Sequence, residues 1–248
     1  MKILALYSIK GGVGKTASAV NLAYNAAQSG FRTLVWDLDP QGASSYYFRI
    51  KPKIKGGSKG LMAGKREMDD LIKGTDFDNL DLIPSDFSYR NLDLLLDDKK
   101  KPTRQLKKRL QPLADDYDFV FLDCPPSISL LSEAVFEASD LLISPIIPTT
   151  LSLRTLAQLK EFIAQHELKN TRLVPFFSMV DNRKKMHKAI MQEVRADCPG
   201  LLKTAIPYAS DIERMGLERM PLAAYSGKSR SAAAYRELWQ ELLALTNP

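Results

Sequence analysis

The 248-residue sequence predicts an α/β fold in which a doubly wound, mostly parallel sheet is flanked by helices. Short apolar runs that resemble buried parallel strands recur along the chain, and most end in glycine, proline or aspartate. Segments with the apolar spacing of helices lie between them, as expected for strands joined by helical crossovers. We expect a single domain over residues 1–248, because a chain of this length can form one core.

The first expected strand, Lys2 to Ser8, leads into a glycine-rich loop that reads K-G-G-V-G-K-T from Lys10 to Thr16. Such a loop points backbone N–H groups at phosphate oxygens, while Lys15 supplies a positive charge and the Thr16 hydroxyl a magnesium ligand. The next segment, Ala17 to Ser29, is rich in Ala and Leu and predicts a helix. Strand, loop and helix together place a phosphate at a helix N-terminus, the arrangement of the P-loop NTPase fold.

The loop departs from the common pattern G-x-x-x-x-G-K-[ST], because Ile9 replaces the first glycine and a second lysine, Lys10, follows it. It resembles the deviant Walker A motif of the ParA/MinD superfamily of dimeric ATPases. The resemblance implies ATP and Mg²⁺ as cofactors, and a Lys10 that reaches across a nucleotide-sandwich dimer to the partner's phosphates. It also implies catalytic roles for Lys10 and Lys15. The nucleotide-binding residues expected here are Lys10, Gly11, Gly12, Val13, Gly14, Lys15, Thr16 and Ala17.

The second expected strand, Phe31 to Leu38, ends in the sequence D-L-D-P-Q-G. Its two aspartates, Asp37 and Asp39, are one residue apart and would point to the same side, at the strand end where open α/β sheets bind ligands. One carboxylate can hold a magnesium-bound water while the other orients the water that attacks the γ-phosphate. The motif resembles switch I of ParA proteins, although Ala43 stands where that family usually has Asn. By this resemblance Asp39 is tied to hydrolysis and Asp37 supports the metal.

The third expected strand, Asp118 to Leu122, closes on Asp123, and the chain continues Cys-Pro-Pro-Ser. An apolar run that ends in Asp is the Walker B form, whose carboxylate contacts magnesium, usually through water. D-C-P-P-S is similar to switch II of ParA proteins. The expected metal site therefore contains Thr16, Asp37 and Asp123.

Two further strands are expected, Leu141 to Ile147 and Arg172 to Val180. Asn182 follows the second of them, at a strand end that commonly faces the adenine in P-loop proteins. The segment Ile-Pro-Tyr that contains Pro207 resembles the I-P-R stretch of ParA proteins, whose backbone borders the base, with Tyr208 in place of Arg. We therefore expect Asn182 and Pro207 in the nucleotide site.

The formal charge of +6 and the sequence pI of about 9.2 favour a polyanionic partner. Residues 183–230 are strongly basic, and in ParA proteins the surface formed by this part holds non-specific DNA across the dimer. The implied DNA-binding residues are Arg183, Lys184, Lys185, Lys188, Arg214, Arg219, Lys228 and Arg230. A lysine- and glycine-rich stretch at about 51–65 predicts a flexible loop.

The last expected helix has an apolar stripe that includes Tyr235, Leu238, Trp239 and Leu242. Its other face is mixed and slightly acidic, unlike the basic face of a membrane-binding helix, and it resembles the closing helix of ParA proteins that docks on the core. Since no segment is long and apolar enough for a membrane span, we expect no membrane partner. Two cysteines fit a reducing cytoplasm, so a cytoplasmic protein is expected. The resemblance to ParA proteins implies that it associates with the nucleoid.

Together these motifs predict an ATP-dependent dimerising ATPase that binds non-specific DNA and segregates plasmid or chromosomal cargo. It resembles the small ParA type without an N-terminal helix-turn-helix region. A ParB-like protein or a cargo adaptor would stimulate its slow hydrolysis. Three alternatives remain open: an orphan ParA-like ATPase that positions a protein assembly such as a chemotaxis cluster or a carboxysome, a metabolic P-loop enzyme, and a DNA-binding protein without catalysis.

Overall fold

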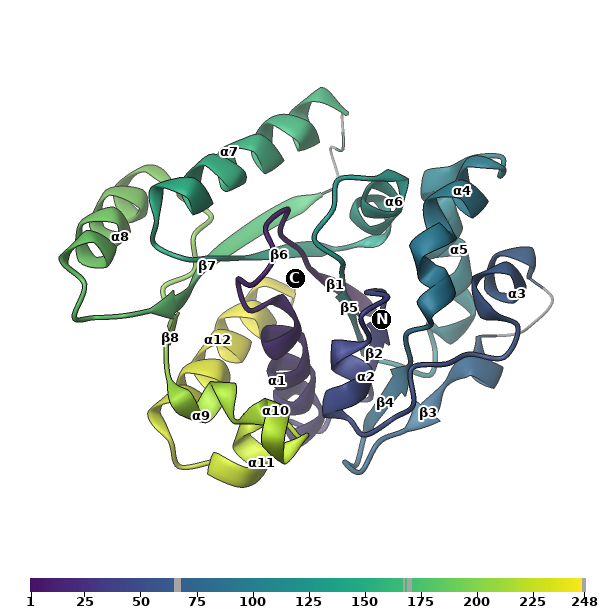
Figure 1. Cartoon of the computed structure of the whole chain (residues 1–248), viewed down its shortest axis with the longest axis horizontal. Coiled ribbons are helices and arrows are strands. Elements are labelled where there is room, and N and C mark those ends of the chain that lie inside the picture. Colours follow the sequence, from purple (N-terminus) through teal and green to yellow (C-terminus); the bar gives the residue numbers. More distant parts are fainter. Residues whose placement is uncertain (65–67, 167, 169–170, 247–248) are drawn as a thin grey trace.

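The computed structural model of the chain describes residues 1–64, 68–166, 168 and 171–246. Its strands are β1 (Lys2–Leu6), β2 (Thr33–Asp37), β3 (Lys73–Gly74), β4 (Leu80–Ile83), β5 (Phe119–Asp123), β6 (Leu141–Ile146), β7 (Arg172–Val180) and β8 (Ala205–Pro207). Within this described part they form one eight-stranded sheet in the order β3-β4-β2-β5-β1-β6-β7-β8, shown in Figure 1. Neighbouring strands are parallel except for β3, which is antiparallel to β4 at the edge.

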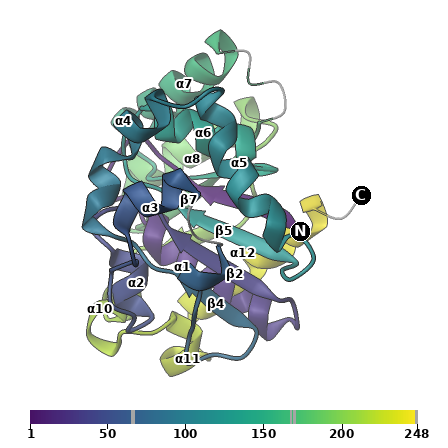
Figure 2. The same cartoon turned by 90° about the vertical axis from the view of Figure 1, so that its right-hand side faces the viewer.

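Helices cover both faces of the sheet. Their bounds are α1 (Lys15–Gln28), α2 (Ala43–Tyr47), α3 (Gly57–Ala63), α4 (Leu92–Asp97), α5 (Gln105–Leu110), α6 (Leu130–Ala138), α7 (Thr150–Gln165), α8 (Lys185–Asp197), α9 (Ser210–Glu213), α10 (Met215–Glu218), α11 (Leu222–Ser226) and α12 (Arg230–Thr246). One face packs against α3 to α7, and the opposite face packs against α1 and α12, as Figure 2 shows.

Alternating side chains of the central strand explain this two-sided cover. Ile3, Ala5 and Tyr7 belong to the core beneath α3 to α7, whereas Leu4 and Leu6 belong to the core beneath α1 and α12. Successive strand residues point to opposite faces, so a strand that is apolar throughout needs helices on both sides. The predicted doubly wound, mostly parallel fold is confirmed.

The strand order places three motif-bearing strands side by side. β1 lies between β5 and β6, and β2 pairs with the other side of β5. The chain moves outward from β1 in one direction to β2 and later in the other direction to β6, so β1 marks the point where the order reverses. Ligands of open α/β sheets bind at the carboxyl ends of strands at such a point.

The segment at about 51–65 differs from the flexible loop that its composition predicts. It contains α3, whose Leu61 and Met62 are buried in the core. The Ser58 amide donates a hydrogen bond to Ser88 Oγ at 2.7 Å, which fixes the start of the helix. Gly56 and Gly64 adopt left-handed conformations at φ 88° and 68° and end the helix on both sides. Here the glycines terminate an element, so counting them as a sign of mobility was wrong for 57–63; Lys65 lies outside the described residues.

The closing helix α12 docks on the core as predicted. Its Tyr235, Leu238, Trp239 and Leu242 side chains are buried. The Trp239 ring meets the Phe119 ring edge-to-face at a centroid distance of 5.0 Å, and its Nε1 donates to Ser29 Oγ at 3.2 Å. Among the described residues, no helix combines the length and apolar composition that a bilayer crossing requires.

Replacing Trp239 by Ala should destabilise the fold by about 3–5 kcal/mol, because the change leaves a large cavity between α12 and β5. Urea denaturation followed by circular dichroism measures this loss. Gln240→Ala on the exposed face of the same helix is the matched control and should change the free energy of unfolding by less than about 0.5 kcal/mol. Equal effects of the two substitutions would contradict the docking of α12 through Trp239.

Candidate functional site

The glycine-rich loop joins β1 to α1 and is shaped by two glycines with positive φ. Gly12 has φ 70° and Gly14 has φ 93°. A Cβ atom on Gly14 would lie 2.9 Å from Ser178 Oγ, so both the backbone conformation and the close approach of β7 require glycine there. The Lys15 amine donates a hydrogen bond to the Lys10 carbonyl at 3.3 Å and closes the loop. Burial lowers the pKa of Lys15, and the nearby Asp123 carboxylate opposes that shift.

Two buried carboxylates lie next to this loop. Asp37 at the end of β2 and Asp123 at the end of β5 are paired in register across the parallel ladder, and both are fully buried. Thr16 Oγ1 donates to one oxygen of Asp123 at 3.3 Å, and Ser44 Oγ donates to the other at 2.8 Å. Ser45 holds Asp37 Oδ2 through its amide at 2.8 Å and its hydroxyl at 2.7 Å. The structure thus brings together Thr16, Asp37 and Asp123 as predicted.

Ser44 and Ser45 are functional residues that the sequence reasoning missed. They lie in the first turn of α2, one residue after the D-L-D-P-Q-G motif, and both side chains are fully buried. Gly42, with φ 68°, makes the turn that places them beneath the two carboxylates. The available signal was a pair of small hydroxyl residues two positions after the motif glycine, since buried carboxylates need nearby donors.

The electrostatics of the pair suit a bound cation. Burial raises the pKa of Asp37, and the neighbouring Asp123 raises it further; burial also raises the pKa of Asp123. Asp37 Oδ1 is buried and has no hydrogen-bond partner among the described residues. An oxygen left in this way fits Mg²⁺ or one of its bound waters, because Mg²⁺ takes oxygen ligands and retains several waters.

The ligand set is small. No group of three or more His, Cys, Asp and Glu side chains able to hold a metal occurs in the described ranges. A magnesium ion here would therefore rely on Thr16, Asp37 and Asp123 together with water and phosphate oxygens, as P-loop sites do.

Asp39 lies apart from the buried pair, on the loop after β2, and is half-buried. Its Oδ1 accepts a hydrogen bond from the Gln41 amide at 2.9 Å, and its carbonyl accepts one from Ser85 Oγ at 2.5 Å. The carboxylate therefore caps its own loop in this state and is held by a residue that follows β4. The Asp39 carbonyl also accepts a hydrogen bond from the Gly42 amide at 2.9 Å, so the backbone of this loop is anchored at both Ser85 and Gly42.

Lys10 is half-buried on the other side of the loop, and its backbone amide donates to Ser8 Oγ at 3.3 Å. Its side-chain amine forms no ion pair with a carboxylate of the described residues. Lys10 lines a small internal cavity together with Ser152 and Thr155 at the start of α7. The adjacent Leu151 is 64% exposed, so an unpaired cation and an exposed apolar side chain lie at the same edge.

A cavity of about 190 Å³ opens beside the glycine loop at the ends of β7 and β8. It contains the predicted Gly12, Gly14, Ala17 and Pro207. Residues that sequence reasoning did not assign also line it, namely Ser178, Met179, Ile206, Tyr208, Ala209, Ile212, Glu213 and Tyr235. Its position next to the phosphate loop suits a nucleoside.

Asn182 does not line the cavity beside the glycine loop, and its contact with the base stays a prediction. It lines a separate cavity of about 420 Å³ with Pro207 and Arg230. The physical reason is a turn after β7: the Asp181 amide donates to His187 Nδ1 at 3.1 Å, and the chain enters α8. Asn182 is therefore carried past the cavity beside the P-loop, and only Pro207 lines both cavities.

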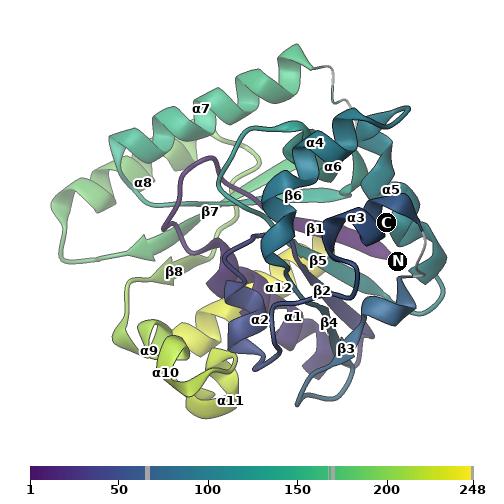
Figure 3. The same ribbon diagram turned by 45° about the vertical axis from the view of Figure 1, so that its right-hand side comes forward.

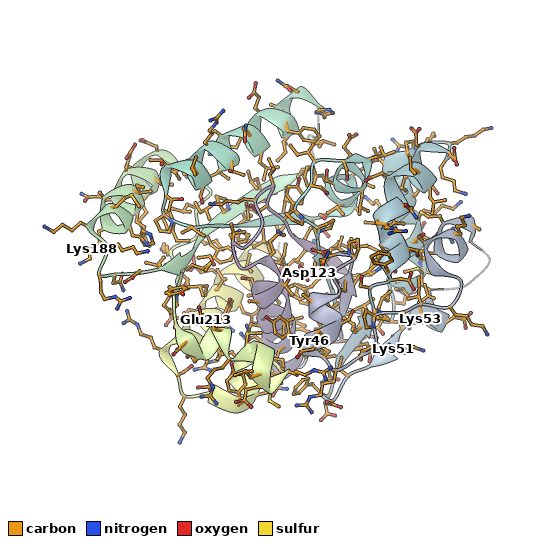
Figure 4. The ribbon with its side chains drawn as sticks, viewed as in Figure 1. Tyr46, Lys51, Lys53, Asp123, Lys188 and Glu213 are labelled. Atoms are coloured by element: carbon orange, nitrogen blue, oxygen red, sulfur yellow. The ribbon has the colours of Figure 1, made fainter. Side chains whose placement is uncertain are left out.

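The predicted DNA-binding residues fall into two groups. The first group surrounds the starts of α8 and α12 and consists of Arg183, Lys184, Lys185, Lys188, Lys228 and Arg230. All six are exposed, and Figure 4 shows Lys188 pointing outward from α8. Arg183 is paired with Asp181 at 2.9 Å, whereas the other five form no ion pair with a described residue.

The second group, Arg214 and Arg219, lies at the two ends of α10 and is already engaged. Arg214 pairs with Glu218 at 2.6 Å. The Arg219 guanidinium lies 4.4 Å from the centre of the Tyr46 ring and donates to the Tyr46 carbonyl at 3.2 Å. Partners of this kind reduce the charge available to a phosphate, so the first group is the stronger candidate surface.

Comparison with known proteins agrees with this geometry. Residues 1–174 match the family model described as an AAA domain. The chain is 30% identical over 249 residues to the sporulation initiation inhibitor protein Soj of Bacillus subtilis, and the alignment covers 98% of each chain. The protein belongs to the ParA-like family of P-loop ATPases. It is also 29% identical to the chromosome partitioning protein ParA of Myxococcus xanthus, with all of this chain and 89% of that one covered.

Solved structures show the same ParA-like fold. Cobyrinic acid a,c-diamide synthase from Mycobacterium smegmatis, with bound ADP and magnesium, has a TM-score of 0.84 at 25% identity and covers 98% of this chain and 94% of its own. Cyanothece McdA in an ATP complex has a TM-score of 0.86 at 23% identity and covers 98% and 96%. The second likeness concerns the fold alone.

Lys15→Ala should weaken the binding of an ATP analogue by about 3 kcal/mol, or more than a hundredfold in Kd, because it removes the buried cation of the loop. Isothermal titration calorimetry measures the change. Lys59→Ala on the exposed face of α3 is the control and should bind like the parent. Normal affinity in Lys15→Ala would refute the P-loop assignment.

Proposed function

We propose that this ParA-like protein binds ATP with Mg²⁺, dimerises in that state, and uses the dimer to hold DNA and to segregate or position a cargo. The observation that carries the proposal is Lys10. A P-loop needs one lysine for its own nucleotide, which Lys15 supplies, and Lys10 adds a second amine without an ion-pair partner among the described carboxylates. The homology to Soj and ParA supports this reading.

The loop and the carboxylates account for ATP binding. The loop amides and the N-terminus of α1 would receive the phosphates, and Lys15 would neutralise part of their charge. Thr16, Asp37 and Asp123 would hold magnesium, which would neutralise further negative charge of the phosphates. The cavity lined by Ala17 and Pro207 would receive the nucleoside.

Slow intrinsic hydrolysis follows from the position of Asp39. We infer that Asp39 orients the attacking water, and in this structure its carboxylate instead accepts the Gln41 amide. Phosphoryl transfer depends mainly on positioning and electrostatics, so a carboxylate that points elsewhere leaves the reaction slow. A ParB-like protein or a cargo adaptor would then stimulate hydrolysis by ordering this loop.

Dimerisation would place Lys10 against the nucleotide of the second subunit. The amine lies at an edge where Leu151 is 64% exposed, and an interface would cover both. Because the γ-phosphate completes this charge pairing, the dimer would form with ATP and separate after hydrolysis. Light scattering with and without ATP and magnesium measures the change in mass.

DNA binding would use the exposed basic group at the starts of α8 and α12. Five of its cations are unpaired among described residues, and the dimer would present two such groups. Contacts of this kind are independent of sequence and sensitive to salt, and they would associate the protein with the nucleoid.

A second candidate, a metabolic P-loop enzyme, is favoured by one observation: the synthase from Mycobacterium smegmatis is 25% identical over nearly the whole chain. An enzyme of that kind would turn ATP over only with a small-molecule acceptor. ATP hydrolysis that DNA stimulates in the absence of any acceptor supports the ParA-like function and excludes this one.

Asp39→Ala should yield an ATP-bound dimer that hydrolyses ATP at least about a hundredfold more slowly than the parent, since the proposed water-orienting carboxylate is lost. Phosphate release and light scattering measure the two properties. Asp78→Ala, an exposed aspartate before β4, is the control and should retain parental hydrolysis and dimer lifetime. Parental hydrolysis by Asp39→Ala would show that Asp39 has another role.

The triple variant Lys184→Ala, Lys185→Ala and Lys188→Ala should lower the slope of log K against log salt for DNA binding by about three, roughly one for each phosphate contact. Filter binding over a salt series measures the slope. The control removes three exposed lysines that lie near or on α5, namely Lys100, Lys107 and Lys108. In Figure 1, α5 lies on the far side of the molecule from α8. Equal slopes in the two variants would place the DNA surface elsewhere.

A further inference from the structure

A cavity outside the nucleotide site lies between the segment that follows α2 and the edge of the sheet. Its volume is about 480 Å³, and none of its residues belongs to the P-loop, the carboxylate pair or the basic group of α8. Figure 3 shows the chain between α2 and α3, which supplies Ile50 to Lys55, and the edge strand β3, which supplies Lys73. The lining residues are Ile50, Lys51, Lys53, Ile54, Lys55, Asp70, Leu71, Lys73 and Pro84.

Four of the residues that line the cavity are lysines, which carry positive charge. Lys51, Lys53, Lys55 and Lys73 are all exposed, and none forms an ion pair with a carboxylate of the described residues. Figure 4 shows Lys51 and Lys53 on the opposite side of the molecule from Lys188, so they are separate from the proposed DNA surface. Asp70 lines the cavity as well, but the four lysines outnumber it, so the concave surface has a positive potential that attracts an anionic partner.

The apolar part of the lining narrows the class of partner. Ile50, Ile54, Leu71 and Pro84 also line the cavity; Ile50 is half-buried and the other three are buried, so they form its apolar floor. A phosphate backbone offers no apolar group to such a surface, whereas an acidic peptide with leucine or phenylalanine matches both the charge and the apolar lining. The volume also suits a few side chains better than it suits a duplex, which needs an extended surface.

The cavity is connected to the loop that holds Asp39. Pro52, between two of the lysines, lies against Gly42, where an added Cβ would be 2.9 Å from Pro52 Cβ. Pro84 precedes Ser85, whose hydroxyl donates to the Asp39 carbonyl and whose amide donates to Ser45 Oγ at 2.9 Å. An occupant that moves either wall therefore moves a direct contact of Asp39 or of the carboxylate pair.

We propose that this lysine-lined cavity binds an acidic, partly apolar peptide segment of a partner protein, and that its occupancy shifts the Asp39 loop through Pro52 and Ser85. The coupling half of this proposal rests on the proposed ATPase function. The binding half does not, because it requires only the cavity and its charges.

A labelled synthetic peptide in which Asp and Glu alternate with Leu is the probe, and fluorescence anisotropy measures its binding. The variant Lys51→Glu, Lys53→Glu and Lys55→Glu should bind it at least about tenfold more weakly than the parent. The control reverses the same number of exposed charges at Lys100, Lys107 and Lys108 and should bind like the parent. Equal binding by the two variants would overturn the proposal.

Two further measurements, of DNA binding and of ATP hydrolysis, distinguish the remaining outcomes. If the cavity variant no longer binds a double-stranded DNA oligonucleotide but still binds the peptide, the cavity is a nucleic-acid site and the proposal is wrong. The peptide should also change the ATP hydrolysis rate of the parent and leave that of the cavity variant unchanged. Binding without any such change would overturn the coupling, whereas a parent that hydrolyses no ATP would refute the proposed function and leave the binding result intact.

Discussion

The site depends on a pair of buried carboxylates that face each other in register across two parallel strands. Asp37 and Asp123 would repel each other in a dry interior, so the surrounding chain must supply donors and, in the working state, a cation. The sheet order that makes β2 and β5 neighbours creates the pair, and the N-terminal residues of α1 and α2 supply the donors. One oxygen of Asp37 is left without a hydrogen-bond partner among the described residues, and a magnesium ion or its bound water would fit that oxygen.

Much of this site could be predicted because its signals are local. The glycine loop, the two aspartate motifs and five of the strands are contiguous patterns, and each strand ends next to its motif. β3, β4 and β8 were missed because they are two to four residues long, too short for a periodicity to be recognised. Ser44 was missed for a different reason: it donates to Asp123, which lies alongside only once β5 is in place. Ser45 was missed because its donation to Asp37 depends on the turn at Gly42.

Another expectation failed because composition was used where geometry decides. Lysines and glycines at 51–65 predicted a loop, yet Gly56 and Gly64 take the left-handed conformations that begin and end a helix. Asn182, expected at the base from the usual phasing of a strand end, does not line the cavity beside the P-loop, and its contact with a nucleotide stays a prediction.

The contacts of α2 have a mechanical consequence. This helix has only five residues, and its first turn holds both carboxylates while Tyr46 contacts the helix that carries Arg219. The Tyr46 hydroxyl also donates to the Gly216 carbonyl at 3.2 Å. An element so short has few internal degrees of freedom between its two attachments. A displacement of α2 at the carboxylates would therefore also displace its contacts with Gly216 and Arg219 at the outer surface.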